Sequence, residues 1–193
     1  MAAQPKPQNR PISNIVFVVA MQTEALPIVN RFQLTEDPHS PFPQGAPWVH
    51  YHGTFKDLNI NLIWTGNDPT LGTAGGFKAK GASIGDIFVV SECAFHDRRI
   101  PIPIFDLYGV GLRKAFETPK LVKELNLKGA AIAYVADLLK VPAIFIKAVT
   151  NNVDDDKAIV EEFLQNLAAL TVELGLAVEQ VINFINGKCI SEL

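Results

Sequence analysis

The stretch that decides the fold is Ile15-Val-Phe-Val-Val-Ala20, which Met21-Gln-Thr-Glu24 follows directly. Its apolar and largely β-branched side chains predict a strand that is covered on both faces. Open α/β sheets place their ligand crevices beyond the carboxyl ends of such strands. Glu24 is therefore a candidate general base. An exposed glutamate that opens a helix is the equally weighted alternative.

Outward from this strand, the spacing of apolar residues predicts the other elements. We expect helices at 25–32, 119–127, 130–140 and 157–186, and strands at 48–52, 58–64, 86–91 and 143–150. Strands that alternate with helices favour an α/β fold with a mixed sheet. In the first helix, Leu26, Val29 and Phe32 would face one side and Pro27 would lie in the first turn, where proline is tolerated.

Two segments predict irregular structure. Six glycines between 66 and 85 indicate a long loop, which is uncommon in a compact domain unless it is functional. Its run Gly72-Thr-Ala-Gly75-Gly76 could cradle a phosphate or ribose, but it has neither Walker nor G-x-G-x-x-G spacing. Residues 100–111 alternate prolines with large apolar side chains, which predicts an extended lid.

Composition excludes several classes of protein. The chain has 193 residues, 48% of them hydrophobic, and a net charge of −3. This predicts one globular domain at 12–193 after a flexible leader at 1–11, and it gives no support for a nucleic-acid partner. The apolar runs are too short to cross a membrane. Two cysteines and a leader without an apolar core predict a cytoplasmic protein.

The remaining polar motifs are weak signals. Asp154-Asp155-Asp156 lacks the spacing of a calcium loop, and carboxylates that open the last helix are the favoured interpretation. His96-Asp97-Arg98-Arg99 fits a surface turn better than a catalytic histidine or an anion site. The four histidines and two cysteines show no metal-ligand spacing.

Longer motifs carry a resemblance that covers nearly the whole chain. The chain resembles the plant 5′-methylthioadenosine/S-adenosylhomocysteine nucleosidases of the purine nucleoside phosphorylase superfamily. The resemblance implies a nucleoside phosphorylase-like mixed sheet flanked by helices, with no cofactor and no metal. The similar stretches are Ile12–Leu26, Thr73–Asp86, Phe95–Gly111, Gly129–Thr150 and Glu161–Glu192.

The implied reaction is hydrolysis of the N-glycosidic bond of a methylthioadenosine-type nucleoside, which releases adenine and a thioribose. Because the bond breaks through an oxocarbenium-like state, one carboxylate activates water and an acid protonates the purine. By resemblance, Glu24 activates the water, Met21 lines the ribose side and Thr73 lies near the water and sugar. Phe163 would cover the alkylthio group.

The resemblance also implies a homodimer. The segment 102–107 is similar to the piece that reaches into the partner subunit's pocket in family dimers. Phe105 and Leu107 are the substrate-binding candidates within it.

Two departures from the family pattern predict a crippled enzyme. The family's Thr-Asp-x-Val-Asp motif reads Thr150-Asn-Asn-Val-Asp154 here, so that Asn151 replaces the purine-side acid. The ribose-binding Met-Glu pair before Gly129 is replaced by Asn126-Leu-Lys128. The resemblance also implies that segments are missing between 72 and 73 and between 128 and 129, which makes the chain about 60 residues shorter than a family domain. The sheet would then be incomplete, with unpaired edges. A non-catalytic nucleoside-binding, storage or interaction protein is the alternative function.

Overall fold

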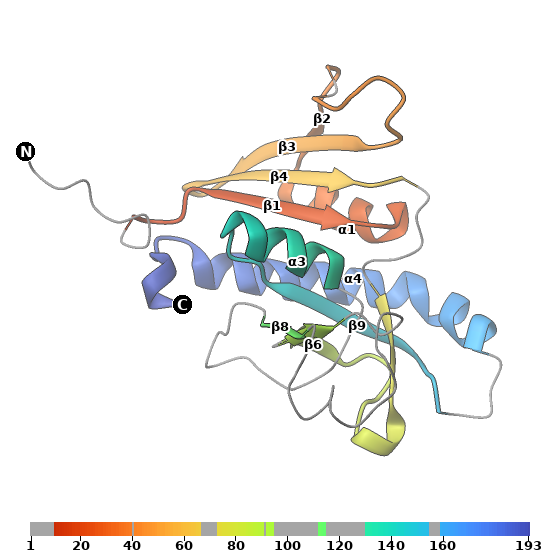
Figure 1. Cartoon of the computed structure of the whole chain (residues 1–193). Coiled ribbons are helices and arrows are strands. Elements are labelled where there is room, and N and C mark those ends of the chain that lie inside the picture. The colour runs from red at the N-terminus through yellow and green to blue at the C-terminus, as the bar shows by residue number, and fades with distance from the viewer. Residues whose placement is uncertain are drawn as a thin grey trace, which may run out of the picture. The chain divides into compact units, whose positions relative to one another are not determined.

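The computed structural model describes residues 10–39, 41–66, 73–90, 92–94, 112–114, 130–154 and 159–193 (Figure 1). They belong to two compact units, which are treated one at a time. Unit 1 lies within Met1–Gly72 and Val160–Leu193, and unit 2 within Thr73–Ile159. The predicted lid and the predicted helix at 119–127 lie outside the described residues.

Unit 1 is built on a four-stranded sheet. In spatial order its strands are β1 (Asn14–Val19), β4 (Leu58–Trp64), β3 (Val49–Phe55) and β2 (Thr35–Glu36). β1 runs parallel to β4, whereas β3 is antiparallel to both β4 and β2. The mixed sheet and the predicted strands at 15–20, 48–52 and 58–64 are confirmed.

One face of this sheet is a closed apolar layer. Successive side chains of a strand point to opposite faces, so Leu58, Ile60 and Leu62 lie on the same face, and each is at most 1% exposed. Phe17 pairs with Leu62 across the sheet and stacks on Phe32 of the neighbouring helix, with ring centroids 6.1 Å apart. The apolar alternation of β4 thus fixes which face packs on the helix.

The other face of β1 is open. Val16 and Val18 are 56% and 41% exposed, so the prediction of a strand covered on both faces is wrong. β1 is the edge strand of its sheet among the described strands, and the helix packs on only one of its faces. The apolar composition of the segment predicted the strand correctly, but it did not show that one face of the strand is exposed to solvent.

Helix α1 (Gln22–Phe32) begins three residues before the predicted start. Pro27 therefore lies beyond the first turn, and Leu26 is 41% exposed instead of sharing the apolar face. The helix ends at Phe32, and the next residue, Gln33, closes the last turn with a left-handed φ of 52°. Its buried residues are Glu24, Ala25, Ile28, Val29 and Phe32.

Helix α4 (Ile159–Ile185) confirms the longest predicted helix. It runs without a break past Gly175, where a Cβ would stand 3.5 Å from Pro27 Cβ of α1. Within it, Glu161–Ile185 contains an 18-residue window with a mean hydropathy of 1.5, so this helix, unlike the short apolar runs considered above, is long and apolar enough to cross a membrane by length and composition alone. The core helix of a soluble protein passes the same test, and α4 has such a buried stripe: Leu170, Leu174, Val178, Ile182 and Ile185.

The end of the chain returns to its beginning within unit 1. After α4 comes the short helix η3 (Ile190–Glu192). The Ile12 N–H donates to the Lys188 carbonyl at 2.8 Å, and Pro11 forms an antiparallel bridge with Cys189. These contacts join Pro11 and Ile12 to the segment that follows α4.

Unit 2 centres on β9 (Phe145–Asn152). β5 (Thr73–Gly76) pairs with it in parallel on one side, and β6 (Ile87–Val90) pairs antiparallel on the other. The strands predicted at 86–91 and 143–150 are confirmed. The loop predicted from 66 to 85 is wrong in part, because its Thr-Ala-Gly-Gly run is strand β5, which the short helix η2 (Lys78–Lys80) follows.

The described part of unit 2 also contains the two-stranded sheet of β7 (Glu92–Ala94) and β8 (Leu112–Lys114), and helix α3 (Ala130–Leu139). α3 confirms the helix predicted at 130–140. Among the described residues of the unit, buried apolar side chains form two small clusters: Val90, Ala133 and Phe145 in one, and Ala82, Phe88 and Val149 in the other.

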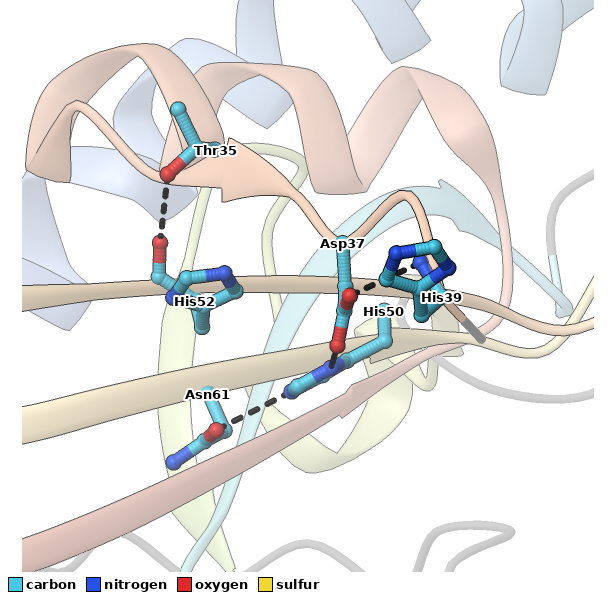
Figure 2. Close-up of polar contacts among 6 residues, drawn as sticks. All are labelled: Thr35, Asp37, His39, His50, His52 and Asn61. Carbon is cyan, nitrogen blue, oxygen red and sulfur yellow. Dashed lines mark hydrogen bonds and ion pairs between the residues drawn. The ribbon is translucent and has the colours of Figure 1, made fainter. Parts of the chain in front are cut away.

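A polar network lies on the open face of the unit 1 sheet (Figure 2). The His50 ring places Nδ1 3.2 Å from Asp37 Oδ2 and Nε2 3.0 Å from Asn61 Oδ1. The backbone N–H of His39 donates to the other oxygen of Asp37 at 2.9 Å. The carboxylate thereby joins the segment after β2 to strands β3 and β4.

This network predicts a loss of stability in acid. The His39 N–H, and after it the His50 side chain, hold the pKa of Asp37 below its ordinary value. A carboxyl group whose pKa is lower in the folded state contributes stability above its unfolded pKa, and that contribution is lost as the pH falls through the folded pKa. We expect Asp37→Asn to lower the melting temperature at neutral pH, and the difference from the parent chain to shrink as acid protonates Asp37. Melting curves across this pH range measure the difference, and a constant difference would contradict the assignment.

Candidate functional site

The corner between β1 and α1 is held by contacts from the end of β4. Trp64 Nε1–H donates to the Ala20 carbonyl at 3.1 Å, and the Thr65 N–H donates to the Val19 carbonyl at 3.0 Å. Ala20 itself is 1% exposed. These contacts fix the chain where it leaves the sheet, and thereby fix the residues that open α1.

Glu24 is the functional candidate at this corner. It is the third residue of α1 and is 0% exposed, so the exposed, helix-opening alternative is wrong. Its Oε2 accepts the Met21 N–H at 3.3 Å, while the Glu24 N–H donates to the Met21 carbonyl at 3.1 Å. A carboxylate buried in this way is held in one position, as a general base must be.

The other candidates of unit 1 are less enclosed. Met21 is half-buried just before α1, and Phe163 is half-buried near the start of α4. Met21 and Glu24 are joined directly by the hydrogen bonds at the start of α1. The structure therefore brings together two of the three candidates that it places in unit 1.

Asn151 and Thr73 lie on paired strands of unit 2. In the parallel ladder of β5 and β9, Thr73 is opposite Ala148 and Gly75 is opposite Asn151, with a register shift between Ala74 and Gly75. Asn151 is 5% exposed, and its Oδ1 accepts the Thr150 hydroxyl at 3.1 Å. The Asn151 amide is thus held at the carboxyl end of a buried strand, where ligands of α/β sheets bind.

The glycines of β5 permit this close pairing. A Cβ on Gly75 would stand 2.4 Å from Val153 Cγ1 and 3.3 Å from Asn151 Nδ2. Any larger residue at Gly75 would collide with the segment that carries Asn151. The sequence left open a weakly supported cradle for a phosphate or ribose in this run, and the structure shows that Gly75 packs closely against β9 and the residue that follows it.

Asp154 has a different role from the one predicted. α4 begins at Ile159, and the Asp154 carboxylate instead accepts the backbone N–H groups of Lys78 and Ala79, each at 2.8 Å. The interpretation of Asp154 as a carboxylate that opens the last helix is therefore wrong, and Asp155 and Asp156 lie outside the described residues. Sequence reasoning missed this contact because its partners lie 76 and 75 residues away.

The candidates thus fall into two groups, one in each unit: Met21, Glu24 and Phe163 in unit 1, and Thr73 and Asn151 in unit 2. Phe105, Leu107, the motif at 96–99 and the stretch at 126–128 lie outside the described residues. Within the part of the chain that the structure describes, no three His, Cys, Asp or Glu residues are grouped so that they could hold a metal ion.

Comparisons with known proteins agree with the fold. The chain is 49% identical to 5′-methylthioadenosine nucleosidase of Arabidopsis thaliana, over 95% of this chain and 91% of that protein. It is 45% identical to the 5′-methylthioadenosine/S-adenosylhomocysteine nucleosidase of the same plant, over 96% and 97%. The solved apo structure of the Arabidopsis thaliana 5′-methylthioadenosine nucleosidase matches with a TM-score of 0.83 at 45% identity, covering 95% of this chain and 100% of that one. No family model matches the chain.

The lengths of these matches support the prediction that this chain is shorter than its relatives. The first match extends over 244 residues, whereas 95% of the 193 residues here is about 183, so about 60 positions of the match have no counterpart in this chain. The identity nevertheless extends over nearly all of both proteins, and the strands and helices match a solved nucleosidase. The chain belongs to the family of 5′-methylthioadenosine/S-adenosylhomocysteine nucleosidases.

Proposed function

We propose that this chain binds 5′-methylthioadenosine and hydrolyses its N-glycosidic bond, releasing adenine and a thioribose, with strongly reduced turnover. The observation that carries the proposal is Glu24, a fully buried carboxylate at the corner between β1 and α1. The names of two plant relatives at 45% and 49% identity supply the substrate class. Methionine salvage, in which such a nucleoside is consumed, is the corresponding metabolic context.

The proposed reaction gives separate roles to Glu24 and Asn151. Glu24 removes a proton from the water that attacks the anomeric carbon, while the bond to the purine breaks and its electrons pass to the base. The leaving adenine then needs a proton at N7. Asn151 can donate a hydrogen bond to N7 through its amide, but it cannot give up a proton and remain as a stable anion. Binding is therefore better supported than rapid turnover.

Nucleoside binding without turnover is the second candidate function. It is favoured by Asn151 at the family's acid position and by the absence of about 60 positions that the relatives possess. Such a protein would hold adenine or the intact nucleoside without cleaving it. Adenine release separates the two functions, because only the first produces it.

We also propose a cytoplasmic homodimer. The dimer follows from the likeness of residues 102–107 to the segment that family members insert into their partner, and light scattering measures the mass in solution. Cysteine usage supports the proposed location, because two cysteines suit a reducing compartment. A fluorescent fusion that leaves the cytoplasm would contradict it.

Isothermal titration with adenine and with 5′-methylthioadenosine tests the binding proposal. We expect a saturable heat with both ligands, and a clear loss of methylthioadenosine affinity in Glu24→Gln, which keeps the size of the side chain but removes its charge. Asp37→Asn is the matched control, because it makes the same carboxylate-to-amide change in the polar network of unit 1. No heat with either ligand from a chain that melts cooperatively would rule out both nucleoside functions.

A further inference from the structure

The Asp154 carboxylate links two segments that are far apart in the sequence. Its Oδ1 accepts the Lys78 N–H and its Oδ2 accepts the Ala79 N–H, both at 2.8 Å. These two amides belong to the first turn of η2, where backbone N–H groups have no partner within the helix. Phe77, the residue that precedes η2, provides no side-chain cap. Asp154 therefore supplies from the end of β9 the acceptors that the local sequence lacks.

The contact continues the pairing of β5 with β9. The ladder ends with Gly76 opposite Asn152, and one residue further the Val153 N–H donates to the Gly76 carbonyl at 2.9 Å. The Asp154 bonds come next along the same line. Three successive hydrogen bonds, one from Val153 and two to Asp154, thus connect the end of β9 to the end of β5 and to η2.

The negative charge of Asp154 strengthens its hydrogen bonds with the two backbone amides of η2. The N–H groups of Ala79 and Lys78 hold the pKa of Asp154 below its ordinary value, because they stabilise the ionised form. A carboxylate offers both oxygens to two donors at once, and hydrogen bonds to a charged acceptor are stronger than those to a neutral one. Alanine at this position would leave both amides of η2 without their acceptors.

We propose that Asp154 is a positioning residue of the nucleoside site. By binding η2 to the end of β9, it keeps Asn151 on β9 at a constant position relative to Thr73 on β5. Asp154 acts through these residues, because the contacts of its carboxylate are with the backbone of η2. The inference rests on the proposed role of Asn151 in binding the purine.

The test compares Asp154→Ala and Asp154→Asn with Asp86→Ala as matched control. Asp86 also accepts a backbone amide within unit 2, that of Ser83 at 2.8 Å, and this bond joins its side chain to the turn before β6 instead of to η2. We expect Asp154→Ala to weaken adenine binding about tenfold and to speed hydrogen exchange of the Lys78 and Ala79 amides about tenfold or more. Asp154→Asn, which retains one acceptor oxygen, should fall between Asp154→Ala and the parent chain.

Three outcomes decide the proposal. Adenine affinity that falls in Asp154→Ala and stays within about twofold in Asp86→Ala supports it. Faster exchange of the η2 amides with unchanged adenine affinity would reduce Asp154 to a cap and overturn the proposal. If the parent chain binds no adenine, the proposed function is wrong, but the positioning role of Asp154 can still be tested. The side-chain amide NMR signal of Asn151 then decides positioning, because it must shift in Asp154→Ala and stay unchanged in Asp86→Ala.

Discussion

Adenine release from 5′-methylthioadenosine by this chain is expected to be at least about 100-fold slower than release by the Arabidopsis thaliana nucleosidase that is 49% identical to it. The loss of a general acid costs about 10²–10⁴ in rate, because the leaving group departs without its proton. Asn151 cannot supply that proton. The carboxylate that would grip the ribose lacks a counterpart at 126–128, which adds to the deficit. Chromatographic measurement of adenine from both proteins under identical conditions gives the ratio.

Asn151→Asp separates the two causes of this deficit. The Thr150 hydroxyl that donates to Asn151 Oδ1 at 3.1 Å can donate equally to an aspartate oxygen, so the local geometry tolerates the change. We expect the rate to remain far below that of the relative, because we expect the missing ribose-side positions to account for most of the loss. Glu24→Gln on the Asn151→Asp background should abolish any activity that returns, which serves as the control for contaminating enzyme. Adenine release by the parent chain near the relative's rate would overturn the prediction.

The elements that the sequence predicted well are those whose apolar pattern is strong and local. β1 and α4 were predicted because β-branched runs and helical spacing are properties of the segment itself. β5 was missed because Thr-Ala-Gly-Gly has little intrinsic preference for a strand. Its extended form comes from pairing with β9, which lies more than seventy residues away and which Gly75 can approach closely. Tertiary contacts override local propensity at this point.

In the candidate site too, the sequence predicted what depends on local pattern and missed what depends on tertiary contacts. Position at the end of a predicted strand was enough to single out Glu24, but its burial depends on the packing of α1 and the sheet, so the sequence left two interpretations open. Asp154 was assigned to the wrong helix because a carboxylate before a helical pattern fits a helix start. Its actual partners, Lys78 and Ala79, come close only when β5 pairs with β9.

Gly76→Ala is expected to destabilise the protein by about 1–3 kcal/mol, because it overpacks the core of unit 2. A Cβ at Gly76 would stand 2.8 Å from Val149 Cγ1 and 2.9 Å from Ala82 Cβ. Val149 is 0% exposed and Ala82 is 4% exposed, so neither neighbour has free space to move into. Ala82 Cβ is also fixed to the backbone, and no rotamer change can relieve the contact. The strain therefore falls on the pairing of β5 with β9, which holds the Asn151 segment.

Urea or thermal melting followed by circular dichroism measures this loss, and two variants make the result specific. Gly175→Ala is the control for the same chemical change, since its Cβ would lie at an ordinary 3.5 Å from Pro27 and alanine favours the helix. Its stability should be unchanged or raised. Adding Ala82→Gly to Gly76→Ala removes one of the two colliding atoms and should recover part of the loss, although Ala82→Gly by itself removes buried apolar surface. A Gly76→Ala chain as stable as the parent would show that β5 can move away from Val149 without cost. The register that brings Gly75 beside Asn151 would then be only weakly held.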